Sequence, residues 1–90
     1  MVSLRFGGVR FVLYSNDHPP RHVHGFSGET EAIVDLRVNR TVALANRGGA
    51  VRPLNAKRSD VKKILQVAAE RFDELAAMWE ALHGKTESGA

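Results

Sequence analysis

An apolar stripe in the last third of the chain constrains the fold more than any other feature. Hydrophobic residues recur there at alternating spacings of four and three, at Val61, Leu65, Ala68, Phe72, Leu75, Trp79 and Leu82. This period places all of these side chains along one side of an α-helix. The sequence therefore predicts one long helix from Asp60 to His83, with Ser59 as its N-cap and Gly84 after its last residue. At 1.5 Å per residue, this helix would be roughly 36 Å long.

The residues before this helix have the alternating pattern of β-strands. One run carries apolar residues at Val9, Phe11 and Leu13. A second run, from Thr30 to Val38, puts Ala32, Val34, Leu36 and Val38 on one face. Because the helix must bury its stripe against another apolar surface, these strands are its partner. The predicted fold is α+β, an antiparallel β-meander of three to five strands packed against one long C-terminal α-helix.

Glycine, asparagine and proline mark the connections between the strands. Gly7-Gly8 fits either a hairpin turn or a bulge, and we favour a kink after a short entry strand because only three strand-like residues precede it. Asn39-Arg40 predicts a two-residue turn that joins two strands as a hairpin. The span Arg47 to Pro53 predicts an exposed connection, which Val51 and Leu54 tether to the core.

Length and composition indicate a single domain without covalent staples. A chain of 90 residues is too short for two cores, so we expect one domain over residues 1–84 and a flexible tail over 85–90. The absence of cysteine excludes disulfides and thiolate metal sites, and it favours a cytoplasmic location. No apolar run approaches the roughly 18 residues of a membrane span, so we expect no membrane association.

Positive charge is concentrated in the first part of the chain. Residues 1–58 contain nine Lys and Arg against four Asp and Glu, a net charge of +5, and residues 59–90 contain four against six, a net charge of −2. The two parts sum to the overall +3. A basic first part can present a cationic face to phosphates, so RNA or DNA is a candidate partner.

The segment from Tyr14 to Gly25 holds three of the four histidines and two of the three prolines. Its first half, through the Pro19-Pro20 pair, stops any regular element. Its second half returns to strand alternation, so His22 and His24 would share one face with Cα atoms roughly 6.5 Å apart. With His18 at the bend, the imidazoles could converge on one site.

Two chemical interpretations of this segment remain open. In the first, His22 and His24 bind zinc or another divalent transition metal, with His18 or Asp17 as a third ligand and one coordination position left open. In the second, the segment cleaves RNA without metal, with His18, His22 and His24 supplying the general base and acid and Arg21 stabilising charge on the phosphate.

A third interpretation leads, in which Asp17 and His18 cap a turn, the histidines bond backbone carbonyls and the prolines stiffen the crossing between strands. Here the segment shapes a surface that binds a protein or nucleic acid, with Tyr14, Asn16, Asp17 and Arg21 as candidate contacts and no required cofactor. We also expect assembly. A long helix overhanging a small sheet would leave Met78, Trp79 and Leu82 partly uncovered, which predicts a homodimer or a complex with a small protein partner.

The histidine segment also carries a family resemblance. The string Asn16-Asp17-His18-Pro19-Pro20 is followed by His22 and His24, then by Glu31-Ala32 and by a helix with Glu74-Leu75 and Trp79-Glu80. Over residues 4–83 the chain resembles the small bacterial family catalogued as domain of unknown function 4160. It departs from the family pattern at Arg21, where a third proline is common, and at Val23, where an aromatic is common. All three motif histidines are kept.

The resemblance implies a context rather than a reaction. Members of the family resemble parts of two-gene cassettes of the toxin–antitoxin type, often beside a second small protein encoded nearby. This implies a role directed at RNA or at a protein partner, and it assigns no activity to individual residues.

Overall fold

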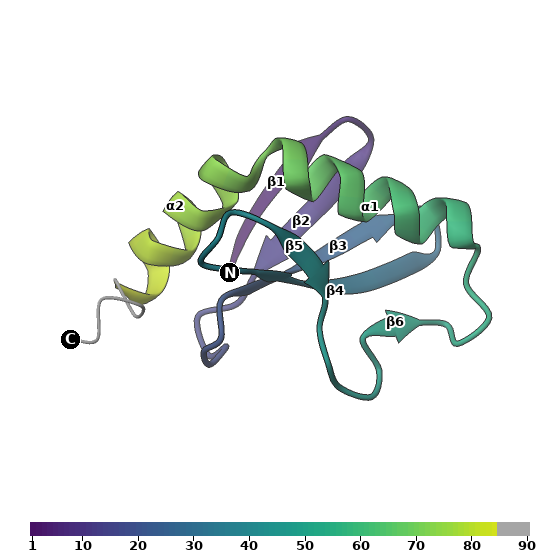
Figure 1. The fold of residues 1–90 in the computed structure, drawn as a ribbon, viewed down its shortest axis with the longest axis horizontal. Coiled ribbons are helices and arrows are strands. Elements are labelled where there is room, and N and C mark those ends of the chain that lie inside the picture. Colours follow the sequence, from purple (N-terminus) through teal and green to yellow (C-terminus); the bar gives the residue numbers. More distant parts are fainter. Residues whose placement is uncertain (85–90) are drawn as a thin grey trace.

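Two helices cover one face of an antiparallel sheet (Figure 1). The structure is a computed structural model and describes residues 1–84, so the expected tail at 85–90 lies outside the described residues. The strands are β1 (Val2–Phe6), β2 (Val9–Leu13), β3 (His22–Ser27), β4 (Thr30–Leu36), β5 (Val42–Leu44) and β6 (Val51–Arg52). The helices are α1 (Arg58–Glu70) and α2 (Phe72–His83). The strand order is β1-β2-β3-β4-β5, and β6 also pairs with β4.

This architecture confirms the antiparallel meander under a C-terminal helical layer, with a sixth strand, β6, added beside β4 to the three to five expected. The prediction of one long helix is wrong. The helix is interrupted at Arg71, whose φ of −110° and ψ of 24° depart from helical values. Helical hydrogen bonds continue on both sides, from the Arg71 N–H to the Val67 carbonyl (2.9 Å) and from the Leu75 N–H to the Arg71 carbonyl (3.0 Å). The interruption is therefore a bend.

The bend solves the overhang that a straight helix would create. α2 turns down past the end of the strands instead of continuing over them (Figure 1). As a result Trp79 is fully buried, with 0% of its surface exposed, so the expectation that it is partly uncovered is wrong. The predicted C-terminal end at His83 before Gly84 is confirmed. The predicted N-cap, Ser59, is two residues too late, because α1 begins at Arg58 with Lys57 in the N-cap position.

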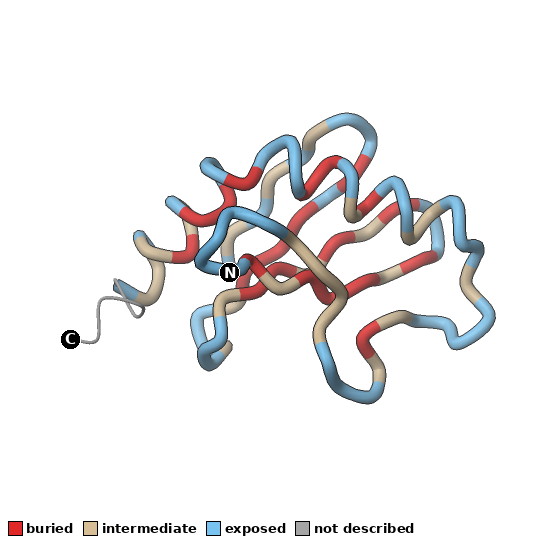
Figure 2. Tube along the Cα trace, viewed as in Figure 1, coloured by how far each residue is buried: buried red, intermediate tan, exposed pale blue. Residues whose placement is uncertain are grey.

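The core lies between the sheet and the inward sides of the helices (Figure 2). The predicted stripe is buried at its centre and half-buried toward its ends, and Ile64 and Val67 beside it are buried as well. The sheet contributes the alternating residues Val9, Phe11, Leu13, Val23, Ala32, Val34 and Leu36. Within residues 1–84, neither helix is both long enough and apolar enough to cross a lipid bilayer.

The first connection is a hairpin, which corrects the expected kink. β1 begins at Val2, so its arm has five residues and pairs fully with β2, from Val2 opposite Leu13 to Phe6 opposite Val9. Gly7 and Gly8 form the turn with φ values of 54° and 81°. Two successive positive φ values are what a tight hairpin turn of this twist requires, and glycine adopts them without steric cost.

The hairpin from β4 to β5 and the loop that follows it differ from the prediction. β4 ends at Leu36, which pairs with Val42, so the hairpin to β5 has more than two connecting residues. Val38 therefore leaves the sheet and is 79% exposed. In the following loop, Val51 packs against the core as predicted, but it does so as part of the short strand β6. Leu54 is 96% exposed and tethers nothing.

Candidate metal centre

The loop between β2 and β3 folds back over the start of β3. The Asp17 N–H donates to the Tyr14 carbonyl (3.1 Å), and the Tyr14 N–H donates to the Asp17 carboxylate (3.2 Å). These two bonds turn the Asp17 side chain toward β3. On β3, His22 and His24 occupy alternate positions, and pairing with Asp35 and Ile33 of β4 fixes their register. Both imidazoles therefore lie on one side of the strand, as the sequence predicts.

Asp17, His22 and His24 form a compact group of potential ligands. One Asp17 carboxylate oxygen lies 3.5 Å from Nε2 of His22, and the other lies 3.6 Å from Nε2 of His24. Ligand atoms of the three residues all fall within 4.8 Å of one another. Two ligands bound tetrahedrally to zinc at 2.0–2.1 Å are about 3.4 Å apart, so the nitrogen–oxygen separations are close to those of a zinc site.

The remaining ring nitrogens are held by acceptors. Nδ1 of His22 lies 2.9 Å from the Pro20 carbonyl oxygen, and Nδ1 of His24 lies 3.2 Å from a Glu31 carboxylate oxygen. Because both partners accept hydrogen bonds, each Nδ1 carries the proton and donates. In a neutral imidazole this leaves the lone pair on Nε2, which faces Asp17. Histidine ligands of metals usually have this arrangement, with the second nitrogen bonded to a carbonyl or carboxylate.

Both Nε2 atoms are buried, and neither has a hydrogen-bond partner within residues 1–84. Their distances to Asp17 exceed the usual length of a hydrogen bond. The side chains of His22, His24 and Asp17 are only 6%, 12% and 16% exposed. Two lone pairs and a carboxylate that converge away from water repel one another unless a positive charge, a proton or a metal ion, lies between them.

A row of aromatic rings forms the wall of this group. The Tyr14 ring packs edge-on against His24, with 4.9 Å between ring centres. On the other side the Trp79 ring lies 5.3 Å from His22, and His83 lies 4.0 Å from Trp79. The bend between the helices places these α2 residues beside the histidines. The rings restrict rotation of both imidazoles and exclude water from that side.

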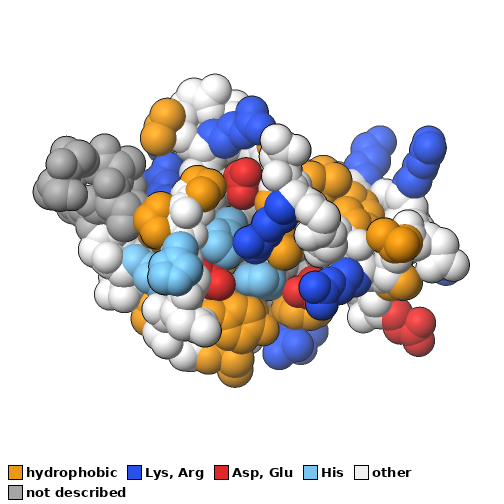
Figure 3. Space-filling view, turned by 90° about the horizontal axis from the view of Figure 1, so that it is seen from below, with side chains coloured by type: hydrophobic (Ala, Val, Ile, Leu, Met, Phe, Trp, Pro, Cys, Tyr) orange, Lys and Arg blue, Asp and Glu red, His pale blue; other side chains and the backbone are white. Residues whose placement is uncertain are grey.

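A pocket of about 320 Å³ adjoins the group. Asp17 and His22 line this pocket, together with Asn16, His18, Pro19, Pro20, Asp35, Ala45, Asn46 and Arg47. His18 is exposed and does not belong to the ligand group. Figure 3, viewed from the side away from the helices, shows histidines gathered around acidic side chains with Lys and Arg side chains nearby.

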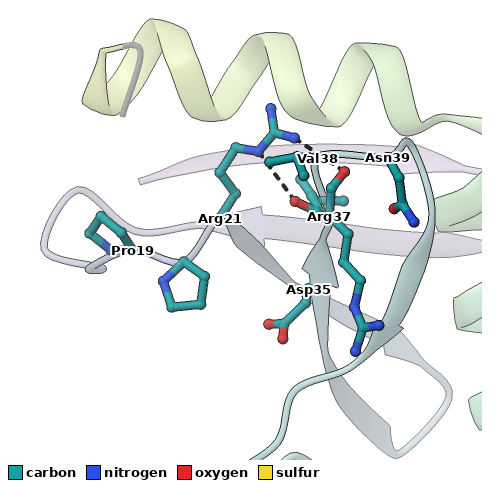
Figure 4. Close-up of a pocket in the computed structure, with 8 residues that line it drawn as sticks. Pro19, Arg21, Asp35, Arg37, Val38 and Asn39 are labelled. Carbon is teal, nitrogen blue, oxygen red and sulfur yellow. Dashed lines mark hydrogen bonds between the residues drawn. The ribbon is translucent and has the colours of Figure 1, made fainter. Parts of the chain in front are cut away.

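Arg21 is directed away from the histidines toward the helices. Its guanidinium donates to the carbonyls of Leu36 (3.2 Å) and Arg37 (3.3 Å), and it lies 3.7 Å from the Glu80 carboxylate of α2. Figure 4 shows these two hydrogen bonds beside a second pocket, of about 530 Å³, and shows the Asp35 side chain pointing the other way. These contacts tie the start of β3 to the end of β4 and to α2.

Of the other candidate residues, Tyr14 contacts His24, and Asn16 is exposed at the rim of the smaller pocket. Sequence reasoning did not assign Glu31 to the site, although a signal was available. The tight turn after Phe26 makes Ser27 pair with Thr30, so Glu31 lies opposite Phe26 and diagonally across from His24 on the same face. No sequence pattern indicated the contacts of Trp79 and His83 with this site, because those contacts depend on the bend at Arg71.

Comparison with known proteins identifies a family. No curated protein and no solved structure matches the chain. The family model described as Domain of unknown function (DUF4160) matches residues 8–80, a range that contains Asp17, His22, His24 and Glu31. The match covers most of the 90 residues. The chain therefore belongs to the DUF4160 family.

Proposed function

We propose that this protein binds a divalent transition metal ion, with zinc as the first candidate, through the Asp17 carboxylate and Nε2 of His22 and His24. The observation that carries the proposal is the convergence of two buried, unpartnered Nε2 atoms on one carboxylate within the described residues. Imidazole and carboxylate ligands suit zinc, iron and related ions. The acceptors on both Nδ1 atoms supply the supporting contacts of such a site.

Three protein ligands leave a coordination position open, as in catalytic zinc sites. A divalent ion held there would supply a water activated as a nucleophile near neutral pH. Asp17 and His22 line a pocket that would admit a substrate beside them. The arrangement therefore supports metal-assisted hydrolysis.

The same geometry argues against RNA cleavage without metal. A general base and a general acid must reach the substrate hydroxyl and the leaving oxygen. In His22 and His24, each Nδ1 is bonded to an acceptor, and each Nε2 is buried and faces Asp17. Arg21 is bonded to backbone carbonyls instead of facing the pocket that the other candidates line. The expected role as a binding module, including its toxin–antitoxin context, stays a prediction.

The test is a thermal shift measured after chelator treatment and readdition of zinc, cobalt or nickel. A ligand that binds only the folded state at 100 times its Kd adds about 2.7 kcal/mol of stability. For a domain of this size, that corresponds to a rise in Tm of roughly 10–20 °C. We expect wild type to show a rise of this order, and we expect Asp17→Asn, which keeps the side-chain size, to lose most of it.

His18→Ala is the matched control, because His18 belongs to the same motif but lies outside the ligand group. It should keep the full metal response. A wild-type Tm that no metal raises would contradict the site, and so would a His18→Ala protein that loses as much response as His22→Ala. Hydrolysis of a chromogenic phosphodiester tests the chemistry, and it should be lost in chelator and in Asp17→Asn. Metal binding without this hydrolysis would support the metal site and contradict the hydrolytic role.

A further inference from the structure

A row of cationic side chains crosses the face of the sheet that the helices leave open. Direct strand pairing places Arg5 opposite Arg10, Arg10 opposite Phe26, Phe26 opposite Glu31 and Glu31 opposite Arg52. Directly paired residues point to the same face. These five residues, here called the arginine row, therefore form one line across five strands. With neighbouring strands about 4.8 Å apart, the line is roughly 19 Å long.

The position of Gly25 shows which face the row occupies. A Cβ at Gly25 would meet Ile64 of α1 and Phe11, so this position faces the helices. Side chains alternate along a strand, which directs His24 and Phe26 to the opposite face. Arg5, Arg10 and Arg52 are exposed there. The view in Figure 3 is from this side.

The arginine row adjoins the candidate metal centre. His24 is two residues before Phe26 on the same face of β3. Glu31 belongs to the row, and its carboxylate is the one that holds Nδ1 of His24 at 3.2 Å. The single acidic residue of the row is therefore already engaged with the centre, and the three guanidiniums leave the row with an excess of positive charge.

The chemistry of the row fits phosphates and bases together. Guanidinium groups bind phosphate oxygens through paired N–H donors. The Phe26 ring supplies an aromatic surface, and it already carries a cation, with the Arg10 guanidinium 5.0 Å from its centre. Arginines that follow a backbone beside an aromatic ring are typical of single-strand binding, where unpaired bases stack on the ring. A duplex keeps its bases stacked internally and offers no such contact.

We propose that the arginine row binds single-stranded nucleic acid, so that its phosphates run across the sheet toward Asp17, His22 and His24. The binding surface stands on the row alone, and the delivery of a phosphate to a metal ion rests on the function proposed above. The row would then select the substrate class for the same site.

The test is fluorescence anisotropy of a labelled oligouridylate, measured in chelator so that the row is examined without metal. Counterion release makes log K fall with log salt by about 0.7 per phosphate neutralised in a single strand. We expect the double variant of Arg5→Ala and Arg10→Ala to reduce that slope by about 1.4. Phe26→Ala should weaken strand binding by about 5- to 150-fold through lost stacking. Phe26→Leu keeps the apolar volume but has no ring, so it should weaken strand binding by a similar factor.

The matched control is the double variant of Arg58→Ala and Lys62→Ala, which removes the same charge from the exposed surface of α1. It should keep the wild-type slope. The proposal would be overturned if this control lost as much of the salt slope as the double variant in the row. It would also be overturned if wild type bound no strand, or bound a duplex equally strongly. Competition by polyglutamate as strong as that by unlabelled strand would overturn it too, because it would identify a surface for acidic polymers in general.

The chelator separates strand binding by the arginine row from metal binding by Asp17, His22 and His24. Strand binding by wild type in chelator supports the row whether or not zinc raises the Tm. A zinc response in a protein that binds no strand overturns the row and leaves the metal centre intact. Melting curves of each variant in chelator test whether the fold is kept, and we expect it to be, because every arginine changed is exposed.

Discussion

Single contacts decide the orientation of the two imidazoles. His24 is held through Nδ1 by Glu31, which comes from the neighbouring strand, and His22 is held by the Pro20 carbonyl of its own chain segment. Only the first of these contacts can be removed by changing a side chain. Substituting Glu31 therefore tests whether the hydrogen bond to Nδ1 contributes to metal binding.

We expect Glu31→Ala to weaken zinc binding by about 10- to 100-fold, the usual effect of removing a contact behind a histidine ligand. Glu31→Gln should recover part of this loss, because its amide oxygen still accepts from Nδ1. The measurement is zinc affinity by competition with a chromophoric chelator. Glu29→Ala is the control, an exposed carboxylate on the same hairpin. Equal affinity in Glu31→Ala and wild type would show that Glu31 does not orient a ligand.

The sequence could place His22 and His24 on one face because strand alternation depends only on local geometry. It could not choose between Asp17 and His18 as the third group. That choice depends on the path of the loop, which the pair of bonds between Tyr14 and Asp17 sets. Neighbouring residues in a turn point in different directions, and one carries its side chain to the histidines while the next is exposed.

At the scale of elements, periodicity identified the helical stripe but not the bend within it. Residues on both sides of Arg71 keep the same spacing and the same hydrogen bonds, so the pattern contains no break to detect. The first hairpin was missed for a related reason. Only three residues before Gly7 look strand-like, yet pairing with β2 extends β1 back to Val2. In both cases a tertiary partner determines the element.

Phe72, the first residue of α2, lies at this bend and is 6% exposed. The guanidiniums of Arg21 and Arg40 lie 5.6 and 5.9 Å from its ring centre. We expect Phe72→Ala to lower the free energy of unfolding by about 3–5 kcal/mol, the usual cost of truncating a core phenylalanine. Chemical denaturation measures this free energy. Gln66→Ala, on the exposed side of α1, is a control that should change it by less than about 0.5 kcal/mol. A loss below about 1 kcal/mol at Phe72 would place its ring outside the core.

At the scale of the whole molecule, the two faces of the sheet differ in character. One is covered by helices with acidic first turns, at Asp60 of α1 and at Asp73 and Glu74 of α2. The other carries the arginine row. The acidic character of the helical layer belongs to α2, because α1 also carries Arg58, Lys62 and Lys63.

Assembly into a homodimer or a complex with a small partner also belongs to this scale and stays a prediction. With Trp79 buried, the apolar surface that remains at the end of α2 is a small pocket of about 140 Å³ formed by Val2, Met78, Ala81 and Leu82. We expect Leu82→Asp to reduce self-association measured by light scattering, because a charge there would have to be desolvated at the interface. Ala77→Asp, on the exposed side of α2, should leave the mass unchanged. A wild type that stays monomeric at high concentration would contradict the homodimer.

The packing of Trp79 against His22 gives the molecule an optical property of its own. Trp79 is the only tryptophan in the chain, and its ring centre is 5.3 Å from that of His22 and 4.0 Å from that of His83. With excitation at the long-wavelength edge of the absorption band, where Tyr14 does not absorb, intrinsic fluorescence originates from this one indole. Its emission reports on the surroundings of the histidines without a label, so events at this end of the sheet can be followed in real time on the unmodified chain.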